Sequence, residues 1–147
     1  MRGAYKVIAH LIALGVLVQA SAVAGGWFGV INEIDGGAVI NEDYEGNFGH
    51  ALHWINGMMV MPLLGLVLFI VSFFTKLPGA VKFGGFTFLA IVVQVILAFV
   101  AFGVPVVGAL HGINAFIVFG LALYAGRRVA TGTADTTMHA TGAPATV

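Results

Sequence analysis

The hydrophobic pattern divides the chain into four long apolar runs, separated by short polar segments or by segments containing Gly and Pro. A helix needs about 20 apolar residues to cross a hydrocarbon core about 30 Å thick, and each run is long enough. The runs are almost continuously apolar, so helical periodicity does not show which face of each helix points inward. The pattern predicts four transmembrane helices, at about 5–31, 50–74, 83–104 and 106–125.

Composition supports this prediction. Hydrophobic residues make up 60% of the chain and charged residues 8%, whereas soluble domains carry about 25% charged residues. We therefore expect an all-α integral membrane four-helix bundle over residues 1–128, with the lipid bilayer as its partner. The net charge of zero gives no indication of nucleic acid. Residues 129–147 hold no apolar stretch to bury, which predicts a disordered cytoplasmic tail.

The charges predict an orientation. The loop between the first two apolar runs contains five of the six acidic residues and no basic residue. Basic residues precede the first run, flank the loop between the second and third, and follow the fourth. Because basic loops stay cytoplasmic, we expect a multi-pass protein of the cell (inner) membrane with both termini cytoplasmic. The basic residues are Arg2, Lys6, Lys76, Lys82, Arg127 and Arg128.

A signal peptide is the alternative interpretation of the first apolar run. Arg2 and Lys6 precede it, and Ala20-Ser21-Ala22 resembles a small-residue cleavage site. Cleavage after Ala22 would leave three spans. The apolar run is longer than a usual signal sequence and continues beyond this site, so an uncleaved first helix is the prediction.

A short repeat marks the second and fourth predicted helices. Residues 51–57 read Ala-Leu-His-Trp-Ile-Asn-Gly, and residues 109–115 read Ala-Leu-His-Gly-Ile-Asn-Ala. Each of the preceding helices contains a Gln, which makes the chain look like two tandem helical hairpins. A pseudo-two-fold axis along the membrane normal would set the two repeated histidines, His53 and His111, opposite each other near the outer face.

Two facing histidines suggest a haem site. Ionisable side chains are rare within membrane spans and usually mark function, and a neutral imidazole needs partners for both of its nitrogens. Haem iron takes axial ligands from protein side chains, and helical bundles commonly hold cofactors between facing helices. The chain has no Cys, which excludes a thioether-linked haem. We therefore expect haem b, with His53 and His111 as axial ligands.

The neighbouring residues suit this hypothesis. Gly57 and Ala115 lie one helical turn after each histidine and leave room for a flat macrocycle. Asn56 and Asn114 lie near the same face and have hydrogen-bond donors. His50, one turn before His53, has three candidate roles: contact with a haem propionate, proton transfer, or contact with outer water. The candidate cofactor-binding residues are His53, His111, Gly57, Ala115, Asn56, Asn114 and His50, of which His53 and His111 are the candidate metal ligands.

The third and fourth helices resemble the haem A synthase family through Gln94, the turn at Gly103-Val104, and Leu110-His111 within a span rich in small residues. The second helix is similar through His53 and Gly57. That family is built from two four-helix bundles, each with a haem between histidines of its second and fourth helices. The resemblance implies that this chain corresponds to one such half. The chain also resembles small four-helix bacterial membrane proteins with a Leu-His-x-x-Asn-Ala signature.

The chain departs from the synthase pattern at two positions. His50 stands where the family has a functional glutamate, and Trp54 stands where an arginine usually follows the histidine. The resemblance therefore implies haem binding without haem modification. We expect electron transfer or haem handling near the outer face, in a protein that is not an enzyme by itself and that has a redox or membrane-complex partner.

Two other classes of function remain open. The chain suits a cofactor-free structural or accessory subunit of a membrane complex, with its histidines in ordinary interhelical hydrogen bonds. A small transporter is the third class. The apolar runs contain no acid or Lys at their centres to form a pathway, and such residues are usual in transporters.

Overall fold

The computed structural model describes the backbone of residues 1–141 and the side chains of residues 1–127. Within these residues the chain is helical and forms no strand. The elements are α1 (Arg2–Asp35), α2 (Phe48–Ile55), the π-helical turn η1 (Asn56–Val60), α3 (Met61–Ser72), α4 (Ala80–Gly103), the 3₁₀ turn η2 (Pro105–Val107) and α5 (Gly108–Thr141).

Four stretches of helix are long and apolar enough to cross a membrane, which confirms the number of spans expected from the sequence. The second span combines α2, η1 and α3. The first helix has 34 residues and is therefore about 51 Å long at 1.5 Å per residue, well beyond a hydrocarbon core of about 30 Å. The candidate spans are Arg2–Asp35, Phe48–Ser72, Ala80–Gly103 and Pro105–Arg127.

The structure differs from the expected pattern at two places. The second span is interrupted by η1, where the Met61 N–H donates to the Asn56 carbonyl five residues earlier. Pro62 follows directly and has no N–H to continue the regular ladder. At the other end of the chain, α5 continues as a helix through Thr141, whereas disorder was predicted from residue 129. The rest of the predicted tail, 142–147, lies outside the described residues.

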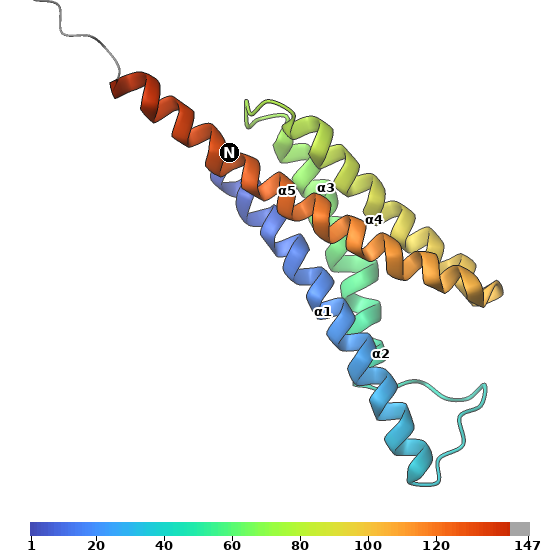
Figure 1. Cartoon of the computed structure of the whole chain (residues 1–147). Coiled ribbons are helices and arrows are strands. Elements are labelled where there is room, and N and C mark those ends of the chain that lie inside the picture. The colour runs from blue at the N-terminus through green and yellow to red at the C-terminus, as the bar shows by residue number, and fades with distance from the viewer. Residues whose placement is uncertain (142–147) are drawn as a thin grey trace, which may run out of the picture.

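The helices pack in a ring (Figure 1). α1 contacts α2, α3 and α5, while α4 contacts α3 and α5. The α1–α3 hairpin and the α4–α5 hairpin lie together near the N-terminus. They diverge toward the α1–α2 loop and the α4–α5 turn (Figure 1). The bundle therefore has a closed end and a forked end.

The hydrophobic core fills the closed end. Small side chains predominate there, and small residues allow helices to approach closely in membranes. The buried hydroxyl of Tyr5 donates to the Ala80 carbonyl (3.2 Å), and Arg2 Nε donates to the Thr75 carbonyl (3.3 Å). These bonds tie the N-terminus to the α3–α4 connection. The core residues are Tyr5, Ala9, Ile12, Ala13, Met61, Leu68, Ala80, Ala90, Ile91, Val118, Ala122 and Ala125.

Large apolar side chains cover the outside of the bundle. Leu63, Leu89 and Phe116 are 61%, 58% and 78% exposed, a degree of exposure that suits contact with lipid and not with water. Together with the length of the helices, this surface indicates a multi-pass membrane protein. The basic residues lie at the closed end, whereas five of the six acidic residues lie in or beside the α1–α2 loop at the forked end.

Candidate cofactor site

The structure brings His53 and His111 together at the fork between the hairpins. Their ring centroids are 6.3 Å apart, with an angle of 61° between the ring planes. His53 lies on α2 and His111 on α5, two helices that face each other diagonally across the ring of helices. Because the centre of a bundle lies between diagonal helices, the two imidazoles meet there and not at the lipid surface.

Both histidines use the same nitrogen to contact a preceding helix. His53 Nδ1 lies 3.4 Å from the main-chain oxygen of Gln19, and His111 Nδ1 lies 3.0 Å from that of Gln94. A carbonyl oxygen only accepts hydrogen bonds, so each Nδ1 carries the proton. In the neutral imidazole this leaves the lone pair on Nε2, so Nε2 is the nitrogen available to a metal.

The repeated asparagines bond between helices. Asn56 Nδ2 donates to the Gly15 carbonyl (3.0 Å), and Asn114 Nδ2 donates to the Ala90 carbonyl (2.8 Å). Each acceptor lies four residues before the Gln whose carbonyl contacts the histidine, so the sequence repeat is also a repeat of hydrogen bonds. Both asparagines are buried. Both side-chain amides donate to the main chain of the preceding helix, and Asn114 Nδ2 also donates to Gln94 Oε1 (2.7 Å).

The two glutamines differ, although their positions match. Gln94 Nε2 donates to the His111 carbonyl (2.9 Å), and its Oε1 accepts from Asn114 Nδ2 (2.7 Å). Gln19 Oε1 is buried without a hydrogen-bond partner. The Gln19 amide lies directly beside Gly57. A Cβ added to Gly57 would be 2.5 Å from Gln19 Nε2.

A cavity of about 550 Å³ surrounds the histidine pair and receives side chains from all four spans. Known cofactor pockets measure roughly 300 to 1,000 Å³. Its wall is mostly apolar, and its polar side chains are His53, His111, Gln19, Gln94 and the indole of Trp54. The small residues Gly57, Gly108, Gly112 and Ala115 line it too, which agrees with the room expected beside each histidine.

His50 lies apart from this cavity's lining. Its Nδ1 accepts from the Asn47 N–H (3.2 Å), while Asn47 Oδ1 accepts from the Gly49 N–H (3.0 Å). The two side chains form a reciprocal cap at the start of α2. The structure therefore gives His50 a part in capping the start of α2, a fourth role beyond the three expected from the sequence.

His10 is the remaining histidine of the transmembrane part of the chain, on α1. Its Nδ1 lies 2.7 Å from the Lys6 carbonyl in its own helix, and its ring packs against Gly126 of α5. This places His10 at the closed end, away from the histidine pair. In the part of the chain that the structure describes, no group of three or more His, Cys, Asp or Glu side chains could hold a metal ion.

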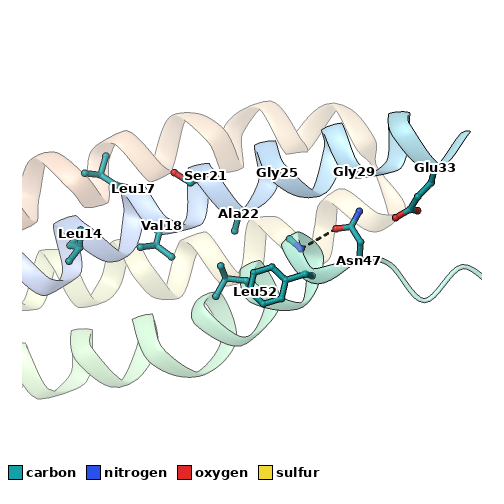
Figure 2. Close-up of a pocket in the computed structure, with 12 residues that line it drawn as sticks. Leu14, Leu17, Val18, Ser21, Ala22, Gly25, Gly29, Glu33, Asn47 and Leu52 are labelled. Atoms are coloured by element: carbon teal, nitrogen blue, oxygen red, sulfur yellow. Dashed lines mark hydrogen bonds between the residues drawn. The ribbon is translucent and has the colours of Figure 1, made fainter. Parts of the chain in front are cut away.

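A second hollow lies on the outside of the α1–α2 pair (Figure 2). It measures about 630 Å³ and follows one face of α1 from Leu14 to Glu33, with Phe48 and Leu52 of α2 on its other side. Figure 2 shows Ser21, Gly25 and Gly29 in succession along α1. The hollow is a shallow apolar groove, and its few polar groups lie toward the forked end.

Sequence reasoning missed several features of the main cavity. Trp54 and Phe99, whose rings are 6.4 Å apart, line it from α2 and α4. The sequence offers no signal for Phe99, because it lies within a continuous apolar run. Pro62 is the signal for η1, since proline within a helix removes a hydrogen bond.

Comparison with protein-family models, curated proteins and solved structures finds no match.

Proposed function

We propose that this membrane protein binds haem b between its two hairpins, with His53 and His111 as the axial ligands. The observation that carries the proposal is the facing histidine pair inside a mostly apolar cavity. Haem supplies four nitrogen ligands itself, so two histidines complete the coordination of its iron. The absence of Cys from the sequence leaves a non-covalently held haem.

The spacing of the rings fits this ligand pair. Two bonds of about 2 Å, with zinc–imidazole lengths as a guide, plus about 1 Å from each nitrogen to its ring centre, give about 6 Å between ring centres. The observed distance is 6.3 Å. The bonds from each Nδ1 to a glutamine carbonyl would fix the orientation of both rings and make each Nε2 more basic.

Electron transfer is the role that this ligation favours. With a histidine on each side of the iron, a substrate reaches the metal only if one ligand leaves. Haem handling is compatible with the same site. The basic charge of the closed end supports a cytoplasmic position for that end, and therefore a position of the fork near the outer face of the cell membrane.

A cofactor-free accessory subunit is the second candidate. It is favoured by the hydrogen bonds of His53, His111, Asn56 and Asn114, which already link α1 to α2 and η1 and link α4 to α5. Such bonds stabilise a bundle without any ligand. In that case the histidines contribute to assembly with a partner complex.

A reduced-minus-oxidised absorbance spectrum of protein purified after haem-replete expression tests the proposal. We expect the sharp bands of a six-coordinate b-type haem in the wild type, and loss of that low-spin signal in His53→Ala and in His111→Ala. His10→Ala is the matched control, since His10 bonds to its own helix outside the cavity. A folded protein without haem, or histidine variants that lose co-purification with a partner while the spectrum is unchanged, would favour the accessory subunit.

A further inference from the structure

His53 and His111 occupy matching places in the repeat, but they are held differently. The bond from His111 Nδ1 is 3.0 Å long, and Gln94 returns a bond to the carbonyl of the same residue. Asn114 in turn holds Gln94 Oε1. His53 has one contact of 3.4 Å, near the outer limit of a hydrogen bond.

The helix that carries His53 is also the irregular one. The π-helical turn η1 begins at Asn56, three residues after His53, and Pro62 lies just beyond it. Such turns frequently occur at functional sites. The residues that follow His111 continue in a regular α-helix, so the backbone supports the two histidines unequally.

We infer, resting on the proposed haem site, that His111 is the fixed ligand and His53 the exchangeable one. The site would then take a small neutral diatomic molecule, of the class of carbon monoxide, nitric oxide and dioxygen, in place of His53. The exchange is redox-neutral. The lone pair of His53 Nε2 leaves the ferrous iron and a lone pair of the incoming molecule replaces it.

Gln19 is the polar group available to such a molecule. It lines the cavity, its buried Oε1 has no hydrogen-bond partner, and its Nε2 donor lies beside Gly57. Gly57 provides the space that this amide occupies. On the other side Gln94 is engaged through both of its amide atoms. A donor beside the exchangeable position is the feature that decides how a haem holds diatomic ligands.

Carbon monoxide binding to the reduced, haem-loaded protein tests this assignment. In the wild type we expect a binding rate that levels off as carbon monoxide increases, because departure of His53 becomes limiting. His53→Ala is expected to keep its haem and bind carbon monoxide at least about tenfold more tightly, because the competing ligand is gone. His111→Ala is expected to lose most of its haem. The reverse pattern, or equal behaviour of the two variants, overturns the assignment.

A matched pair of conservative variants covers the case in which a histidine variant does not fold. Gly57→Ala displaces the Gln19 amide and is expected to change the carbon monoxide affinity several-fold, whereas Ala115→Gly at the matching position leaves it within about twofold, since no free amide lies there. Equal effects contradict the inference. A wild type without haem refutes the proposed function, whereas a six-coordinate haem that never takes carbon monoxide refutes this inference alone.

Discussion

Gln94 and His111 hold each other through two hydrogen bonds. The amide of Gln94 donates to the His111 carbonyl at 2.9 Å, and His111 Nδ1 bonds the Gln94 carbonyl at 3.0 Å. Gln19 stands in the matching position of the first hairpin, yet its Oε1 is buried without a partner. The two halves of the site therefore have similar geometry, but the second hairpin has more side-chain hydrogen bonds than the first.

This difference in hydrogen bonding predicts that the same substitution at Gln94 and at Gln19 changes stability by different amounts. Gln94→Leu removes both side-chain hydrogen bonds of Gln94, to the His111 carbonyl and from Asn114 Nδ2, so we expect a loss of about 2 kcal/mol of unfolding free energy. Gln19→Leu removes an unsatisfied polar atom and is expected to change stability by less than about 0.5 kcal/mol, or to raise it. Thermal unfolding of the haem-free proteins in detergent measures both. Equal losses would contradict the difference between the two glutamines.

The backbones of α1 and α2 approach each other closely at Gly49. A methyl group there would overlap the backbone of Gly26 and the carbonyl of Ala22. Gly49→Ala is therefore expected to cost about 2 kcal/mol of stability through overpacking, and to reduce haem retention by moving α2. Gly25→Ala is the control, because a Cβ there meets nothing within 4 Å. A Gly49→Ala protein as stable as the control would contradict this packing.

Asn47 caps the helix that carries His53. Its Oδ1 accepts from the Gly49 N–H, and its Nδ2 donates to the Gly26 carbonyl (2.8 Å). We expect Asn47→Ala to lower stability by about 1 kcal/mol, the usual cost of losing such a cap. Asn41→Ala, which removes a bond within an exposed turn, serves as the control in the same unfolding assay. If both variants melt alike, the cap does not support α2.

Tyr44 links the α1–α2 loop to α1. Its hydroxyl donates to Glu33 Oε2 (2.6 Å), and this bond raises the pKa of the phenol. Because the folded pKa is raised, the contribution of the bond to stability is complete below the ordinary value of about 10 and is lost as pH rises through the folded pKa.

An absorbance titration checks this direction. The tyrosinate signal that the wild type has and Tyr44→Phe lacks should appear at a higher pH than that of an ordinary phenol. In Glu33→Gln the Tyr44 signal should move back toward ordinary values, because the carboxylate that holds the proton is gone. A Tyr44 signal unchanged by that substitution would contradict the contact.

The orientation of the bundle is open to chemical labelling, because the chain contains no native Cys. We expect Asp43→Cys, in the acidic loop, to react with a membrane-impermeant maleimide in intact cells. Lys76→Cys, between α3 and α4, should react only after the membrane is opened, since basic loops stay cytoplasmic. The opposite pattern of labelling would invert the orientation.

The π-helical turn is a feature that the sequence did not predict, within a helix whose position it did predict. Length and apolarity predicted a span at 50–74, and the structure places it at Phe48–Ser72. Pro62 marks a missing donor, but the sequence does not say whether the helix kinks, ends or widens there. The outcome depends on the neighbours, and in this bundle Asn56 bonds α1 through the Gly15 carbonyl at the start of the turn.

The sequence by itself determined the four helices and the histidine pair. A membrane helix satisfies its backbone hydrogen bonds within one segment, so apolar length alone defines it. The repeat then identified His53 and His111 as equivalent positions. Tertiary structure alone decided that Asn56 and Asn114 bond the backbone, that His50 caps α2, and that the hairpins diverge around a cavity. Almost uniformly apolar spans carry no periodic signal for the rotation of each helix, so the partners of each polar side chain are set only when the helices pack.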